Sequence, residues 1–159
     1  MKQILVITMA MFLSPLSRAQ ELTDTADLLI VGGTESGCAA AIQAARMDVR
    51  RVVVVNDIEW LGGQFSAEAL GAIDENRAHG YDGNVPIPRS GLFREIIDAI
   101  ESKNAVLYDG VTRPGNTRVI TTARPFVAES VFRELLRPHE DCGQIKRYSN
   151  YRVRSVNKQ

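Results

Sequence analysis

The stretch that decides the fold is DLLIVGGTESGCAAAIQAAR, residues 27–46. Its apolar run Leu28–Val31 predicts a strand, and a run that is apolar throughout is typical of a central strand in a parallel sheet. A glycine-rich turn follows, and then an alanine-rich helix over about residues 35–47. The N-terminus of such a helix offers unpaired N–H groups and the positive end of its dipole, so this arrangement predicts a phosphate-binding site.

A second apolar strand comes soon after the helix. Residues 51–55 read RVVVV, which is β-branched and fully apolar after its arginine. Strand, helix and strand together span about thirty residues, the size of a right-handed βαβ unit. Residues 27–56 therefore predict the first unit of a dinucleotide-binding α/β fold.

The turn is a variant of the dinucleotide-binding fingerprint G-x-G-x-x-G, in which three residues and then a small one follow the last glycine. Gly32 takes the first position and allows the tight turn out of the strand. Gly37 takes the last position and, with Ala41, lets the helix lie close to the sheet. Thr34 replaces the second glycine, so its Cβ crowds the approach to a pyrophosphate while its hydroxyl can donate to a phosphate oxygen.

Two further residues of the turn bear on this site. Gly33 restores some of the flexibility lost at position 34. Glu35 is unfavourable beside a dianion unless it points to solvent. A glycine turn between strand and helix is often purely structural, and its place inside a βαβ unit is what favours cofactor binding. We expect the cofactor contacts of the turn to come from Gly32, Gly33, Thr34, Glu35, Ser36 and Gly37.

The residue at the end of the second strand normally carries an acid that binds the ribose hydroxyls of the cofactor. Here that position holds Asn56, with Asp57 next. Asn56 can still hydrogen-bond a ribose, but it lacks the charge that selects a free hydroxyl. The alternative interpretation, that Asn56 starts a turn, fits the chemistry equally well.

The remainder of the chain continues the α/β pattern. Amphipathic spacing predicts helices at residues 91–102, capped by Ser90, and at residues 125–137, stopped by Pro138. Short strands are predicted at residues 118–122, 145–148 and 151–156, and residues 104–117 are interpreted as turns. The expected architecture is a three-layer α/β fold with a parallel sheet.

The first residues have the pattern of a secretory signal peptide. Lys2 precedes a short apolar run at residues 4–13, and Ser17-Arg18-Ala19 offers small residues at a cleavage site. The run is too short to span a membrane. We therefore expect a signal peptide over residues 1–19 and export of a single domain over residues 27–159.

Charge and cysteine content narrow the classes of function. The chain has 19 basic and 19 acidic residues, so a basic face for nucleic acid is not indicated. We expect Cys38 and Cys142 to be free because they fall near opposite edges of the predicted sheet, beyond the span of a disulfide. No clustered histidines or Cys-x-x-Cys pair suggest a metal site, and no Ser-His-Asp order suggests a hydrolase.

Residues 27–46 together with VVVVNDIEWLGGQ, residues 52–64, resemble the N-terminus of FAD-dependent oxidoreductases, in particular of exported bacterial members. The resemblance implies a Rossmann-like FAD-binding fold with FAD as cofactor. It also implies that Gly62, Gly63 and Gln64 lie near the ribityl and pyrophosphate part of FAD. The helix and strand over residues 125–156 are similar to that family in pattern only.

Members of this family are several hundred residues long, whereas this chain ends at Gln159 within a strand pattern. We therefore expect a fold that is incomplete at its C-terminus and carries the ADP-binding front part of a flavoenzyme. Two alternatives remain open at this point, an inactive truncated remnant and a Rossmann domain for a nicotinamide cofactor. Substrate and catalytic residues are not indicated.

Four other residues are functional candidates: Trp60, His79, Arg89 and Arg124. His79 is interpreted as a surface histidine in a loop, and Trp60 as an anchor of its loop. The two arginines each precede a predicted helix, and we expect them to be solvated or paired with acids.

Overall fold

A computed structural model describes residues 21–74, 89–115 and 121–158. It has a parallel sheet of three strands, β1 (Leu28–Val31), β2 (Val52–Asn56) and β3 (Ile145–Ser149), in the order β1-β2-β3. Three helices accompany the sheet: α1 (Glu35–Arg46), α2 (Gly91–Leu107) and α3 (Pro125–Asp141). The parallel α/β architecture expected from the sequence is confirmed.

The central strand of the described sheet is β2 and not β1, which corrects the expectation for residues 28–31. β2 pairs with β1 on one side and with β3 on the other, with Val54 opposite both Ile30 and Arg147. Val52, Val53 and Val54 are all buried, so both faces of β2 are covered. Val31, at the end of β1, is 69% exposed. Uniform apolarity therefore identified two strands but not which of them is central.

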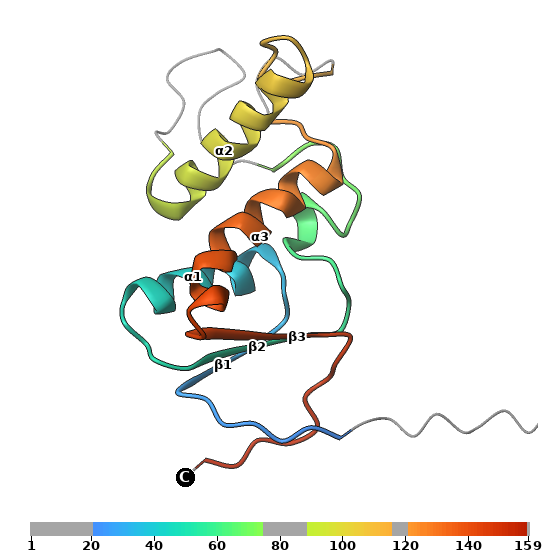
Figure 1. Cartoon of the computed structure of the whole chain (residues 1–159). Coiled ribbons are helices and arrows are strands. Elements are labelled where there is room, and N and C mark those ends of the chain that lie inside the picture. The colour runs from blue at the N-terminus through green and yellow to red at the C-terminus, as the bar shows by residue number, and fades with distance from the viewer. Residues whose placement is uncertain (1–20, 75–88, 116–120, 159) are drawn as a thin grey trace, which may run out of the picture.

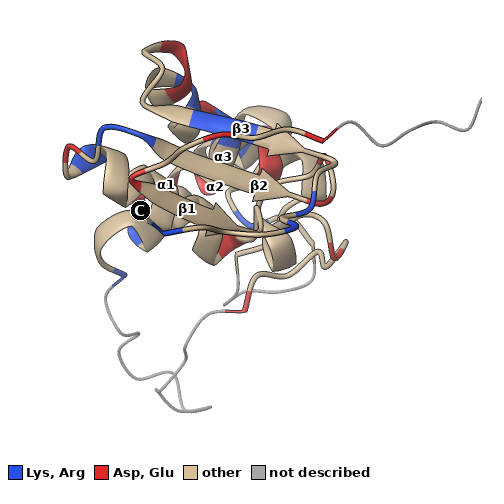
Figure 2. Cartoon of the chain, turned by 90° about the horizontal axis from the view of Figure 1, so that it is seen from below, with Lys and Arg blue, Asp and Glu red and all other residues tan. Residues whose placement is uncertain are grey.

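The described helices lie on one side of the sheet. Figure 1 shows α1 and α3 directly above the strands, with α2 stacked beyond α3. The core fills the space between them, and its fully buried members include Ile42, Val52, Val54, Ile97, Phe132 and Leu136. Seen from below, the strands lie in front of the helices (Figure 2). Among the described residues, the third layer consists of the extended segments 21–27 and 150–158 and contains no helix.

Asp24 fastens the N-terminal extended segment to the sheet. Its carboxylate accepts hydrogen bonds from the Tyr148 hydroxyl at 2.6 Å and the Arg51 guanidinium at 2.5 Å, and it pairs with Lys146 Nζ at 3.0 Å. Tyr148 and Lys146 belong to β3, and Arg51 directly precedes β2. The bond from Tyr148 and that from Lys146 hold the pKa of Asp24 well below its ordinary value of 3.8.

Helix α3 runs past Pro138 to Asp141, so the prediction that Pro138 stops the helix is wrong. Pro138 lies in the last turn, where its ring removes one N–H donor but leaves its carbonyl free to accept from Cys142 N at 3.3 Å. Gly143, at φ +78°, ends the segment and turns the chain into β3.

Helix α2 extends to Leu107, five residues beyond the predicted end. The sequence predicts a turn at Asn104, but the residue is fully buried in the last turns of α2. Its amide nitrogen donates to Thr112 O at 2.9 Å and Thr122 O at 2.7 Å, so it holds two loop segments against the helix. Ser90 occupies the expected cap position in extended backbone, but its side chain makes no capping hydrogen bond.

Two predicted strands differ from the structure. Residues 151–156 are not a strand. Asn150, at φ +63°, turns the chain at the end of β3. The N–H of Tyr151 still donates to Asn56 O, and the chain then leaves the sheet. Most of the strand predicted at residues 118–122 lies outside the described residues. Its last residue, Thr122, forms an isolated antiparallel bridge with Ala72 and does not join the parallel sheet.

The predicted signal peptide also lies outside the described residues. Within residues 21–74, 89–115 and 121–158, we find no helix with the length and apolarity needed to cross a membrane.

Candidate cofactor-binding site

The turn between β1 and α1 is built as the sequence predicts. Gly32 has φ +106°, a conformation that favours glycine, and its N–H donates to Val55 O on β2 at 2.8 Å. A Cβ on Gly37 would lie 2.1 Å from Gly32 O, so only glycine allows the helix to start this close to the strand. The close approach expected at Gly37 is confirmed.

Thr34 is the N-cap of α1, a role that the sequence analysis missed. Its backbone is extended, and its hydroxyl oxygen accepts from Gly37 N at 3.2 Å. Threonine directly before a helix is a recognised capping signal, so the residue type and its position predict this role. The hydroxyl hydrogen is still available to donate, so the phosphate contact predicted for Thr34 is compatible with the cap.

Three backbone donors stand at the start of α1. Among the described residues, the N–H groups of Thr34, Glu35 and Ser36 have no hydrogen-bond acceptor in the protein. They belong to the turn and the first turn of the helix, where N–H groups point along the axis towards the N-terminus. Together with the helix dipole, they form a site suited to an anion.

Gly33 connects this turn to the loop that follows β2. Its N–H donates to Asn56 Oδ1 at 2.9 Å, and its carbonyl accepts from Gly62 N at 2.8 Å. A Cβ at Gly33 would lie 2.7 Å from Asn56 Nδ2 and from Leu61 Cδ2. Gly33 is therefore required by close packing, which is a stronger constraint than the flexibility predicted from the sequence.

Asn56 is buried, 4% exposed, and fully engaged by the protein. Besides accepting from Gly33, its amide nitrogen donates to Ile58 O at 2.9 Å and to Trp60 O at 2.8 Å. These bonds fit the alternative that Asn56 shapes a turn. The ribose contact stays a prediction, and both amide hydrogens are already in use.

The segment Gly62-Gly63-Gln64 lies against the start of α1. Gly62 and Gly63 have φ +101° and +48°, and Gly63–Phe65 forms the short 3₁₀ helix η1. Gln64 N donates to Glu35 Oε2 at 3.3 Å. Glu35 therefore points to η1 and not to solvent, because the free N–H at the start of this short helix attracts its carboxylate.

Cys38 is a buried thiol in the first turns of α1. Its Sγ donates to Gly33 O at 3.5 Å, and burial raises its pKa to about 12. The thiol is therefore protonated and unreactive, and Cys38 acts as a small core residue, as predicted. Cys142 is exposed, and both thiols are free.

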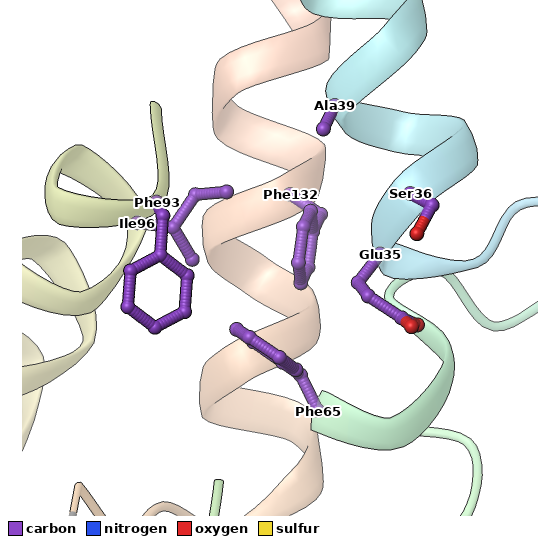
Figure 3. Close-up of a pocket in the computed structure, with 7 residues that line it drawn as sticks. All are labelled: Glu35, Ser36, Ala39, Phe65, Phe93, Ile96 and Phe132. Atoms are coloured by element: carbon purple, nitrogen blue, oxygen red, sulfur yellow. The ribbon is translucent and has the colours of Figure 1, made fainter. Parts of the chain in front are cut away.

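An apolar pocket of about 160 Å³ opens beside Glu35 and Ser36 (Figure 3). Phe65, Phe93 and Phe132 form its aromatic wall, with Phe65 edge-on to both other rings at centroid distances of 6.4 and 5.7 Å. Figure 3 shows that α1, α2, α3 and η1 each contribute to the lining. The pocket adds an apolar wall next to Glu35 and Ser36 at the start of α1.

The other candidates do not join this site. Trp60 is 41% exposed and anchors its loop through its carbonyl, which accepts from Asn56. Arg89 pairs with Glu101 at 3.1 Å, while the guanidinium of Arg124 lies 5.7 Å from the Tyr108 ring centroid. His79 lies outside the described residues. Within the described part of the chain, no group of three metal-ligating side chains comes together.

Comparison with known families identifies the class of protein. The family profile of FAD dependent oxidoreductase matches residues 27–159, which include the turn, the βαβ unit and both later helices. The chain belongs to this family of FAD dependent oxidoreductases. A search of curated proteins found no match.

Proposed function

We propose that residues 32–37 bind the pyrophosphate of FAD and that the βαβ unit around them holds the ADP half of the cofactor. The observation that carries the proposal is the set of three unbonded N–H groups at Thr34, Glu35 and Ser36. The Gly32–Gly37 contact supports it, since a Cβ would fill the space in which helix and strand meet. These features fit a dinucleotide diphosphate.

Different residues bind different parts of the cofactor. Thr34, Glu35 and Ser36 donate backbone hydrogen bonds to the phosphates, and the Thr34 hydroxyl adds a donor. Gly62, Gly63 and Gln64 close one side of the turn, next to the ribityl end of the cofactor. When bound, FAD supplies the hydride or electron transfer of an oxidoreductase, and the protein binds and orients it. The substrate side of the reaction has no residue assigned to it.

The test is a binding comparison on the full chain. FAD, NAD, FMN and ADP are titrated separately by calorimetry, and ADP is then used to compete with FAD. We expect FAD to bind and ADP to displace it, whereas FMN, which lacks the ADP half, binds at least tenfold more weakly. If FMN binds as tightly as FAD, or if ADP fails to compete, the proposed ADP site is wrong. NAD binding tighter than FAD would favour the nicotinamide alternative.

We also propose that the protein is exported. The support is the sequence alone: Lys2, the apolar residues 4–13 and the small residues around Ala19. Expression of the full chain in a bacterium, followed by fractionation and N-terminal sequencing, tests it. A mature N-terminus at Gln20 in the exported fraction is the expected result, and an intact leader on cytoplasmic protein would contradict it.

A further inference from the structure

Asn56 takes the place at which this class of fold usually carries a ribose-binding acid, and its hydrogen bonds indicate a different task. An amide nitrogen has two hydrogens, and both are donated to the carbonyls of Ile58 and Trp60. A carboxylate in the same place has no hydrogen to donate and would leave those two carbonyls without their partner. The loop after β2 therefore requires an amide at this position.

The oxygen of the same amide reaches the turn between β1 and α1. Asn56 Oδ1 accepts from Gly33 N, the last donor before the three free N–H groups. Asn56 also touches Gly33 closely, since a Cβ there would lie 2.7 Å from Nδ2. Gly33 O, in turn, holds Gly62 N. One side chain thus sets the position of Gly33 relative to both β2 and the Gly62-Gly63 segment.

We propose that Asn56 is a positioning residue for the phosphate site: it fixes the turn at Gly33 and the loop at residues 58–60, and it does not bind the adenosine ribose. This inference rests on the proposed function. It predicts that Asn56 influences FAD affinity through the phosphates. A ribose ligand would influence it through the 2′ and 3′ hydroxyls.

A variant-by-ligand cycle separates these two roles. FAD and its 2′,3′-dideoxyadenosine analogue are titrated into wild type, Asn56→Ala and Asn56→Asp, with the exposed Asn157→Ala as the matched control. We expect Asn56→Ala to lose about tenfold in affinity, the worth of about one hydrogen bond, for both ligands alike. Asn56→Asp does not restore binding, because it lacks the two donors. If the loss disappears with the dideoxy ligand, or if Asn56→Asp binds FAD as tightly as wild type, the inference is wrong.

Trp60 supplies a readout without cofactor, since it is the single tryptophan of the chain and its carbonyl accepts from Asn56. We expect its emission to shift in ligand-free Asn56→Ala at temperatures where circular dichroism shows a folded protein, and to stay unchanged in Asn157→Ala. A stability loss with unaltered FAD affinity in the folded protein would mean a purely structural role and would overturn the inference.

A measurement on wild type covers the case in which the variants do not fold. Both Nδ2 protons of Asn56 should be protected from exchange in nuclear magnetic resonance spectra, with and without FAD. A large chemical-shift change confined to one Nδ2 proton when FAD binds would indicate that this proton has moved from its carbonyl to the cofactor and would contradict the inference. If wild type binds no FAD at all, it is the proposed function that fails, so the two failures are distinct.

Discussion

Replacing Gly37 with alanine perturbs the site at its closest internal approach. The new Cβ would lie 2.1 Å from Gly32 O, about 1.3 Å short of the 3.4 Å at which ordinary van der Waals contact begins. Its two closest neighbours are backbone atoms of Gly32, so no side-chain rotation can make room. The first turn of α1 must therefore move away from the end of β1.

Two effects of Gly37→Ala lower the free energy of unfolding, and one raises it. Overpacking of this kind costs about 1–3 kcal/mol, and weakening of the Thr34 cap on Gly37 N adds about 1 kcal/mol. The higher helix propensity of alanine returns at most about 1 kcal/mol. We expect a net loss of about 2 kcal/mol in the free energy of unfolding. FAD affinity should fall at least tenfold, because the free N–H groups move with the turn.

Urea unfolding followed by Trp60 fluorescence measures the stability, and calorimetric titration measures the affinity. Gly71→Ala is the matched control, because a Cβ there meets no atom within 4 Å and its φ is not positive. If Gly37→Ala is as stable as Gly71→Ala and binds FAD equally well, the close approach is not what shapes the phosphate site.

Three further changes test other parts of the structure. Glu35→Gln should strengthen FAD binding about two- to fivefold at low salt, by removing a negative charge beside the phosphates, and high salt should erase the gain; weaker binding at low salt would contradict this. Asp24→Asn should cost about 1 kcal/mol in urea unfolding at pH 7. Because the pKa of Asp24 in the folded protein lies below its ordinary 3.8, the stability difference between wild type and Asp24→Asn shrinks as the pH falls below about 4. A stability difference that grows in acid would refute the reasoning. Phe132→Ala, at a fully buried ring, should lose about 3–5 kcal/mol, whereas Phe126→Ala, 51% exposed on the same helix, should lose less than about 1 kcal/mol; equal losses would contradict the assigned packing.

Sequence patterns located the elements well where they depend on local chemistry. The predicted helix over residues 35–47 corresponds to α1, and the apolar runs correspond to β1 and β2. The sequence pattern did not predict where helices α2 and α3 end. Pro138 predicts a helix stop, but a proline in the last turn removes a single N–H donor and the helix continues to Asp141. Asn104 was interpreted as part of a turn, because nothing local reveals that its amide is buried against two loops.

In the candidate site, too, some residues were predictable from the sequence and others were not. The glycines of the turn were predictable, because a tight turn and a close helix–strand contact need glycine whatever the rest of the fold does. The contact of Glu35 was not predictable, since its partner Gln64 comes from the loop after β2. For Asn56 the sequence left a ribose contact and a turn role equally open, and its bonds to Ile58 and Trp60 fit the turn. Whether a side chain faces a ligand or its own backbone depends on how that loop folds back.

The sequence by itself determined the βαβ unit and its glycine turn, because strand periodicity and glycine sterics act over a few residues. Tertiary structure alone decided that β2 is central, that an extended segment held by Asp24 covers the second face, and that Asn56 binds Gly33. These depend on contacts between residues more than twenty positions apart, which are set by packing and by the need to satisfy buried polar groups.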